Sequence, residues 1–479
     1  MKQLGFFTIS LPQELEILPE SVLGDIHSAF LDTWHQLTSL ISQVRKCQKL
    51  EDYYFLQEKL GLRVLQIDSE IDTANIASYQ ATKELNKLGN SADPEKKLNI
   101  SGKLLEADLK RHLYLLAGKQ YRTVGDAMAW QLYQYNAHTI SSLGMNQSPG
   151  IISQAKKKGA LVEAAEVRTY WEQESAFALR HDYTNCLRVS DLSIFHDNSD
   201  QAELKEVKAS RKKKKISQQA IQRRALEFAQ LHVTELENDI IYYPPVLNTG
   251  DREEILTTML LLSEAVRQAI EEGIGYRVGK HIEIVAYNGP RCARQPYLQK
   301  RLMQINDTHL PISVQPPSDD YIVALGINRV KNPVFSVPYA IYPLPPEVAA
   351  ALTVGLIDIQ VRLNVQVILD AFRANGFDAI CSTSLWRQNG LQPGNPKTLQ
   401  PYFVLSKDGR SIRVTEYPIE QMLFEGLTPT LLAATVARTY EECLARDAFN
   451  IAVSQGQSLH VCTTYTEITD IWRESRMLV

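Results

Sequence analysis

The stretch Asp191-Leu-Ser-Ile-Phe-His-Asp-Asn-Ser-Asp-Gln-Ala-Glu-Leu-Lys-Glu-Val-Lys208 predicts a β-hairpin. Two runs rich in Leu, Ile, Val and Phe flank a polar cluster at residues 196–201, whose composition is typical of a turn between antiparallel strands. If the turn centres on Asn198-Ser199, Asp191 lies opposite Glu206. Because opposed residues share a face and side chains alternate along a strand, Lys208 lies on this face too. The hairpin therefore predicts two acids and a lysine on one side of a sheet.

Opposed carboxylates repel each other unless a cation lies between them. Hard oxygen ligands with open water positions suit Mg²⁺ or Mn²⁺. A nearby lysine can orient an attacking water or help to deprotonate it, while the metal screens the charge of a phosphate. We therefore expect Asp191 and Glu206 to hold the metal and Lys208 to position the water or balance charge.

This arrangement resembles the PD-(D/E)XK nuclease superfamily, whose signature is an acid at the start of one strand and Glu-x-Lys on the next, after a helix with another acid. Ser190-Asp191 stands at the first position and Glu206-Val207-Lys208 at the second. Glu163, four residues after Gly159, matches the acid of the helix, and Glu166, about one turn later, is the alternative. The resemblance implies a restriction-endonuclease-like core in which Glu163 contacts the metal or supports its ligands.

The superfamily often places a glutamine or a basic residue on the next helix, facing the site. Residues 216–228 are predicted to form this helix, and the candidates on it are Gln218, Gln222 and Arg223. Gln222 is assigned to the catalytic group and Arg223 to nucleic-acid binding. The resemblance covers about residues 155–243. It departs from the family pattern in two ways: Ser190 replaces the usual proline, and only residues 177–184 remain for the first strand, which must be short or fused with the next.

A basic run follows the hairpin at Arg211, Lys212, Lys213, Lys214 and Lys215. It lies within residues 205–224, where nine Lys or Arg residues face a single Glu. Binding to a phosphate backbone needs such a patch, although a run of charge alone is more often a solvated loop. Its position beside the predicted site favours contact with nucleic acid, with DNA favoured over RNA. The whole chain has a net charge of −4, so any attraction for nucleic acid is local.

Length and composition bound the rest of the chain. Typical domain sizes divide 479 residues into about three domains, and 44% hydrophobic residues suffice for ample cores. The six cysteines are scattered, with no Cys-x-x-Cys pair and no histidine at zinc spacing, so a disulfide framework and structural zinc are not expected. There is no N-terminal signal pattern and no apolar run of roughly 18–20 residues. We expect a cytoplasmic protein without a membrane partner.

The first 150 residues are predicted to be mostly helical. Leucines recur at helical spacing over residues 105–116, and Gly118 is expected to end that helix. The segment Thr123-Val-Gly-Asp126 resembles a capping box, which predicts that a second helix begins there. No catalytic pattern is present in this region. Its expected role is oligomerisation, binding of a partner protein or covering of the nuclease.

Residues 246–479 are predicted to form an α/β domain of unknown role. The patterns indicate a helix from Asp251 that ends at Gly273, a strand at residues 281–287, and a hairpin through Lys407-Asp408-Gly409-Arg410. Long helices are expected at residues 347–374 and 429–445. The glycines of residues 273–280 do not have the spacing of a phosphate-binding loop, and a helix end with a turn is expected there.

The predicted molecule is thus a multidomain α+β protein. It has a helical domain (1–150), a PD-(D/E)XK nuclease-like α/β core (151–245) and a C-terminal α/β domain (246–479). The predicted function is Mg²⁺-dependent hydrolysis of nucleic acid, as a regulated effector of the kind used in prokaryotic antiviral defence. Two alternatives stay open: a non-catalytic nucleic-acid-binding or scaffold protein with a nuclease-like fold, and a nuclease subunit that cuts only inside a larger complex.

Overall fold

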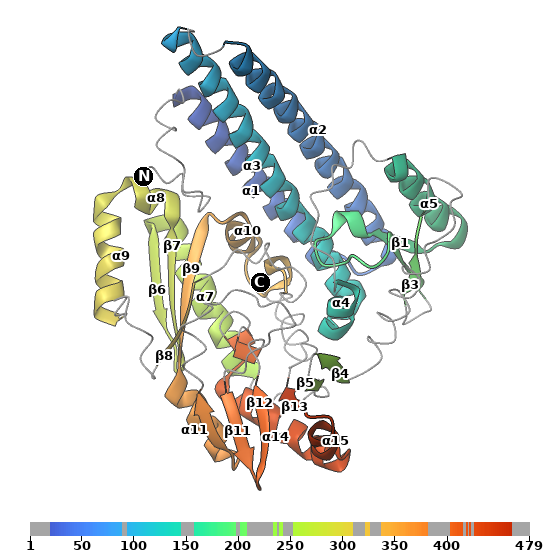
Figure 1. The fold of residues 1–479 in the computed structure, drawn as a ribbon, viewed down its shortest axis with the longest axis vertical. Coiled ribbons are helices and arrows are strands. Elements are labelled where there is room, and N and C mark those ends of the chain that lie inside the picture. The colour runs from blue at the N-terminus through green and yellow to red at the C-terminus, as the bar shows by residue number, and fades with distance from the viewer. Residues whose placement is uncertain are drawn as a thin grey trace.

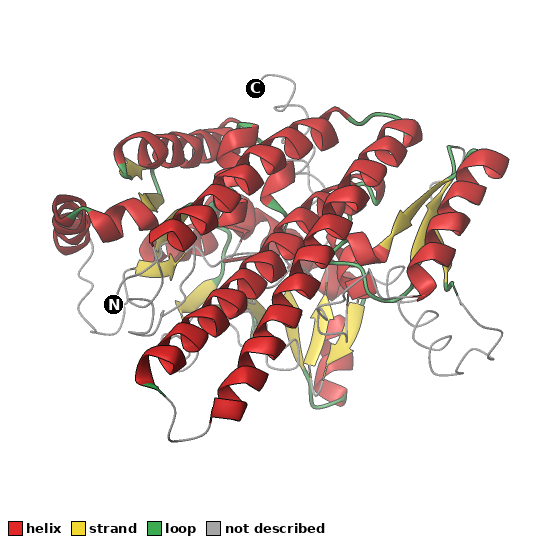
Figure 2. Cartoon of the chain, turned by 90° about the horizontal axis from the view of Figure 1, so that it is seen from above, coloured by secondary structure: helices red, strands yellow, loops and turns green. Residues whose placement is uncertain are grey.

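The computed structural model describes residues 20–88, 93–144, 158–197, 202–207, 233–236, 239–242, 252–309, 321–325, 337–381, 403–414, 418–419, 421–422 and 426–461. Its N-terminal part is helical, as predicted, and consists of α1 (Glu20–Lys46), α2 (Leu50–Leu88), α3 (Pro94–Leu132) and α4 (Ala137–Gly144). The long helices α2 and α3 run antiparallel, side by side (Figure 1). Seen from above, the long helices cross in front of the strands (Figure 2).

Helix α3 is one continuous helix, so the prediction that one helix ends at Gly118 and another begins at Thr123 is wrong. Thr123 does not cap a helix, because its Oγ1 donates to the carbonyl oxygen of Gln120 at 2.6 Å. A Cβ added at Gly125 would lie 1.9 Å from the carbonyl oxygen of Tyr183. The glycine at 125 therefore permits a close approach of another chain segment, and the polar pattern around it serves that contact rather than a helix start.

The middle of the chain forms a three-stranded antiparallel sheet. Helix α5 (Lys158–Glu174) precedes β1 (Phe177–Arg180), the short 3₁₀ helix η2 (His181–Tyr183), β2 (Leu192–Phe195) and β3 (Glu203–Lys205). The strands are in the order β1-β2-β3. The first strand is short, as predicted. One face of the sheet packs on α5, and the other packs on α2, where the ring centroids of Tyr53 and Phe177 are 6.1 Å apart.

A second sheet has four strands in the order β6-β7-β9-β8, all antiparallel to their neighbours. These strands are β6 (Ile274–Val278), β7 (Ile282–Asn288), β8 (Tyr321–Leu325) and β9 (Ile357–Asn364). Helix α7 (Arg252–Glu272) packs against this sheet, and α8 (Gly289–Arg294) and α9 (Pro296–His309) follow β7 (Figure 1). The predicted end of α7 at Gly273 is confirmed, since this glycine has a φ of 95°.

A third sheet has six strands in the order β10-β11-β12-β13-β5-β4. Its strands are β4 (Val233–Leu236), β5 (Asp239–Tyr242), β10 (Asp378–Cys381), β11 (Phe403–Lys407), β12 (Arg410–Val414) and β13 (Ser458–Val461). Three helices accompany it: α11 (Val365–Ala374), α14 (Pro429–Ala445) and α15 (Ala448–Ser454). The predicted hairpin β11-β12 and the helix at residues 429–445 are confirmed.

The long helix expected at residues 347–374 is wrong. Helix α10 (Pro346–Val354) ends at Gly355, which has a φ of 74°, and the chain then forms β9 before α11 begins. Within β9 the apolar residues alternate with polar ones, and Ile357, Ile359, Val361 and Leu363 are buried. A glycine that ends a helix, followed by apolar residues at every second position, indicates a strand, and the prediction did not use this signal.

The main hydrophobic core crosses the boundaries expected at residues 150 and 245. It extends without a break from Leu37 of α1 to Val461 of β13. Strand β5 pairs in parallel with β13, so a sheet joins residues on both sides of position 245. Polar contacts join the N-terminal helices to the C-terminal part as well: Trp34 Nε1 donates to the carbonyl oxygen of Glu347 at 3.1 Å, and Gln120 Nε2 to that of Val354 at 3.1 Å. The helical and the C-terminal parts therefore stabilise each other.

Candidate active site

The register of the central hairpin is the one that the sequence predicted. Strands β2 and β3 pair Leu192 with Lys205 and Ile194 with Glu203. Continued by one residue, this register sets Asp191 opposite Glu206. Both acids are half-buried and lie just beyond the paired strands, at the end of the sheet where the ladder stops.

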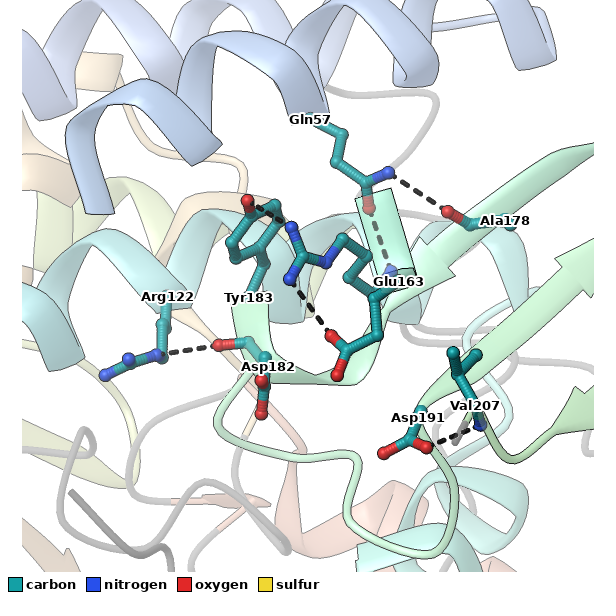
Figure 3. Close-up of polar contacts among 9 residues, drawn as sticks. Gln57, Arg122, Glu163, Ala178, Asp182, Tyr183, Asp191 and Val207 are labelled. Atoms are coloured by element: carbon teal, nitrogen blue, oxygen red, sulfur yellow. Dashed lines mark hydrogen bonds and ion pairs between the residues drawn. The ribbon is translucent and has the colours of Figure 1, made fainter. Parts of the chain in front are cut away.

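Asp191 is held at the strand end by its backbone and by its carboxylate. Its N–H donates to the carbonyl oxygen of Lys205 at 3.2 Å, and its own carbonyl oxygen accepts from the N–H of His181 at 2.9 Å. Its Oδ2 accepts from the N–H of Val207 at 2.6 Å (Figure 3). The carboxylate thus bridges from the end of β2 to the residue that follows Glu206.

Glu163 on α5 forms a buried ion pair with Arg180 at the end of β1. The Glu163 Oε2 and Arg180 Nη2 atoms are 3.0 Å apart, and both side chains are less than a tenth exposed. The guanidinium also donates to the hydroxyl of Tyr183 at 2.6 Å and lies 4.4 Å from the centroid of that ring. Figure 3 shows Asp182 and Asp191 on either side of the Glu163 carboxylate.

The electrostatics link Glu163 to the two nearby aspartates. Burial raises the pKa of Glu163, and the negative charges of Asp182 and Asp191 raise it further, while Arg180 opposes them. Burial and the two aspartates outweigh the ion pair. Glu163, Asp182 and Asp191 therefore form one acidic group around the end of the small sheet, with Arg180 as its buried counter-charge.

Glu166, the alternative acid on α5, has a different partner. Its Oε2 lies 2.6 Å from Lys205 Nζ, which also donates to the hydroxyl of Tyr170 at 2.9 Å. Lys205 pairs across the sheet with Leu192, which pairs in turn with Arg180, so Lys205 and Arg180 lie on the face that packs on α5. Glu166 supports the packing of α5, whereas Glu163 lies in the acidic group.

Polar residues of α2 and α3 position β1 and the loop that follows it, and the sequence prediction missed them. Gln57 donates to the carbonyl oxygen of Ala178 at 3.0 Å and accepts from the N–H of Arg180 at 2.9 Å. Arg122 Nε donates to the carbonyl oxygen of Asp182 at 2.9 Å (Figure 3). The available signal was a set of polar residues at buried positions of helical segments, because such groups need partners.

Asp126 fixes the other end of the same loop. It is buried, and its carboxylate accepts from the N–H groups of Asn185 at 2.5 Å and Cys186 at 2.8 Å and from the Asn185 side chain at 2.8 Å. Burial raises its pKa, and these hydrogen bonds oppose that shift. His181 is also buried; its Nε2 lies 2.6 Å from Ser193 Oγ, and Tyr133 donates to the same oxygen at 2.7 Å. The helices thus determine where the β1-β2 loop lies.

Several predicted site residues lie outside the described residues. These are Lys208, the basic run Arg211, Lys212, Lys213, Lys214 and Lys215, and the candidates Gln218, Gln222 and Arg223. The structure therefore brings together Asp191, Glu206 and Glu163 in one region and does not describe the other predicted site residues. Among the residues that are described, no group of three or more His, Cys, Asp or Glu side chains has the geometry of a metal site.

None of the described helices combines the length and the hydropathy that a membrane span requires. In comparisons with known proteins, the chain matches no protein-family model, no curated protein and no solved structure.

Proposed function

We propose that this chain is a metal-dependent nuclease that hydrolyses phosphodiester bonds, with DNA favoured over RNA. One arrangement supports the proposal. The register of β2 and β3 sets Asp191 opposite Glu206 at the end of the sheet, and the charge of Asp191 acts on Glu163 of α5. A helix with an acid, followed by three antiparallel strands with one acid just before the second and another just after the third, is also the order in which the PD-(D/E)XK nucleases begin.

Carboxylate oxygens at a strand end fit Mg²⁺ or Mn²⁺, because these cations prefer oxygen ligands and retain several waters. Asp191 and Glu206 would hold the metal, which when bound lowers the pKa of a water and screens the charge of the phosphate. Glu163 is held by Arg180 at 3.0 Å, so its role is to set the charge around Asp191 rather than to bind the metal. Lys208 and Gln222 would contact the water or the substrate.

The basic run and the flanking regions complete the proposal. Arg211 to Lys215, together with Arg223, would contact the phosphate backbone, since such contacts depend on charge and not on base sequence. Helix α2 contacts strand β1 through Gln57, and α3 contacts the β1-β2 loop through Arg122. This coupling favours a nuclease under the control of its helical region, as in a regulated effector of prokaryotic antiviral defence.

The test is a cleavage assay of the full chain on duplex DNA, single-stranded DNA and RNA, with Mg²⁺ or Mn²⁺. We expect Asp191→Ala and Glu206→Ala each to lower the rate at least ~100-fold, because each removes a charged ligand of the metal. Glu203→Ala is the matched control, since this acid is exposed and lies on β3, the strand that Glu206 directly follows. Full activity in either site variant, with circular dichroism like that of the parent, would overturn the assignment.

One observation favours a second function, that of a nucleic-acid-binding or scaffold protein without catalysis. Within the described residues, Glu163 is paired with Arg180, and no group of three or more His, Cys, Asp or Glu side chains has the geometry of a metal site. A protein of this second kind would bind one of the three substrates in a gel-shift assay and cleave none of them with either metal. The same preparations used for the cleavage assay decide between the two functions.

A further inference from the structure

Helix α2 exposes an unusual number of large apolar side chains. Of the thirteen exposed large apolar residues in the described part of the chain, five lie on α2: Phe55 (54% exposed), Leu62 (69%), Leu65 (44%), Ile76 (57%) and Tyr79 (69%). The opposite side of α2 is buried, in large part against α3, through residues such as Leu60, Val64 and Ile67. Both sides of α2 are therefore partly apolar, whereas a surface helix normally has one polar side.

The exposed apolar residues have the spacing of a coiled-coil seam. Phe55, Leu62 and Ile76 lie on one seven-residue repeat, and Leu65 and Tyr79 lie on a second repeat that is three residues later. Apolar residues at these two positions of a heptad face a partner helix. The apolar part from Leu62 to Tyr79 spans roughly 26 Å at 1.5 Å per residue. Helix α2 lies at the outer edge of the helical region (Figure 1), where a partner can reach it.

We propose that this face of α2 binds the same face of a second copy of the chain, in a symmetric antiparallel dimer. In a two-fold interface, if one residue faces another, the reverse contact occurs as well. One antiparallel register places Leu62 opposite Tyr79 of the second copy and Leu65 opposite Ile76. In the same register, Ser69 lies opposite Asp72 and Glu58 opposite Lys83.

From Glu58 to Lys83 this register matches every layer in kind, whereas Phe55, at the end of the stripe, lies opposite the exposed Asn86. Apolar side chains meet apolar ones, the polar residues Ser69 and Asp72 meet near the two-fold axis, and the exposed Glu58 meets the exposed Lys83 with opposite charge. Each of these pairs occurs twice by symmetry. A helix from an unrelated protein would need its own matching sequence, whereas a second copy supplies it. The self-complementarity of the stripe therefore identifies the partner as another copy of this chain, independently of the proposed nuclease activity.

The first experiment measures the mass of the full chain by analytical ultracentrifugation over a range of concentrations. We expect a dimer whose dissociation constant rises roughly 100-fold in Leu65→Asp or Leu62→Asp, because each change buries two carboxylates in an apolar seam. Val453→Asp is the matched control, since Val453 is 76% exposed on α15, far from α2 (Figure 1). A monomer at all concentrations, or a dimer that Leu65→Asp does not weaken, would overturn the proposal.

The second experiment tests the register with a charge exchange. Glu58→Lys alone places like charges opposite each other twice and should weaken the dimer about tenfold, and Lys83→Glu should do the same. The double variant Glu58→Lys/Lys83→Glu restores both pairs and should dimerise like the parent. Both substitutions are at exposed positions of a helix, so the helical content of all three variants should stay constant. A double variant as weak as the two single variants combined would contradict the antiparallel pairing.

Discussion

At the scale of single residues, the ion pair between Arg180 and Glu163 connects three parts of the candidate site. It joins α5 to β1 and places a positive charge beside Asp182 and Asp191, and through Tyr183 it reaches the β1-β2 loop. A buried ion pair adds little net stability compared with apolar packing, but removal of one partner leaves a buried charge without compensation. The effect of the pair on the free energy of unfolding is therefore largest when only one of its two partners is replaced.

Arg180→Met should destabilise the protein by about 3–5 kcal/mol, because it leaves the Glu163 carboxylate buried without its counter-charge. The double variant Arg180→Met/Glu163→Leu should recover much of this loss. Arg373→Met is the control, since Arg373 pairs with Asp370 on the surface, where the pair is about half exposed and contributes at most about 1 kcal/mol. Urea unfolding of the three variants measures these differences. Equal losses for Arg180→Met and Arg373→Met would show that the buried pair has no special role.

His181 predicts a pH dependence of stability. Burial, and then the charge of Arg188, lower its pKa to about 3, from 6.5 in the unfolded chain. Because the folded-state pKa is the lower one, the stability it contributes is complete above pH 6.5 and is lost as the pH falls towards 3. The slope in that range is about 1.4 kcal/mol per pH unit. Glu163 and Asp126, whose pKa values are raised, act in the opposite direction.

The measurement is therefore a difference between the parent chain and His181→Gln, which removes only the imidazole contribution. Urea midpoints at several pH values from 7 to 4 should fall less steeply in His181→Gln than in the parent. Parallel curves would mean that His181 is accessible to protons in the folded state.

At the scale of elements, α3 shows how one helix serves two environments. The sequence alone does not distinguish its glycines at 118 and 125. A Cβ at Gly118 would lie 3.6 Å from Arg122 and Ile67, which is an ordinary contact, whereas one at Gly125 would lie 1.9 Å from the backbone oxygen of Tyr183 and clash with it. The first glycine is therefore a weak point of the helix, and the second is required for contact with η2.

Gly118→Ala should stabilise the protein by up to about 1 kcal/mol, because alanine is the better helix former and the space accepts a methyl group. Gly125→Ala should destabilise it by at least about 2 kcal/mol, because the methyl group pushes η2 away from α3. Thermal unfolding compares the two variants in the same helix. A Gly125→Ala chain as stable as the parent would show that the approach of η2 to α3 is not as close as described.

At the scale of the whole molecule, the small sheet depends on its neighbours. Its strand β1 is held by Gln57 of α2, and its β1-β2 loop by Arg122 and Asp126 of α3. Strand β5, which follows the small sheet in the sequence, lies between β13 and β4 in the six-stranded sheet. A piece cut from the middle of the chain loses these hydrogen-bond partners and exposes the apolar face of the sheet. Unpaired polar groups and an exposed face both destabilise such a piece.

The isolated fragment from Gln154 to Tyr243 should therefore be unfolded or aggregate, as judged by circular dichroism and size-exclusion chromatography. A longer fragment that begins at Glu20 and ends at Tyr243 restores α2 and α3 but not β13, and should gain helical signal. A short fragment that folds and cleaves nucleic acid like the intact chain would contradict the shared core and the control by the helical region.

The features that could be predicted from the sequence are those encoded by neighbouring residues. The hairpin register of β2 and β3, the end of α7 at Gly273, the turn at Asp408-Gly409 and helix α14 each follow from local periodicity or turn chemistry. The position of Asp191 opposite Glu206 follows for the same reason, because a hairpin fixes its own register, whereas Glu163 was chosen from the resemblance to the PD-(D/E)XK nucleases.

Other features depend on contacts between residues far apart in the chain. The continuity of α3 through Gly118 and Gly125 follows from packing against Ile67 and Tyr183. The role of Arg180 depends on its neighbours on α2 and α5. The pairing of β5 with β13 brings together segments about 200 residues apart. The residue pattern within one segment cannot predict these long-range contacts. They arise only when the whole chain buries its apolar surface, because buried polar groups must then find partners wherever the fold brings them.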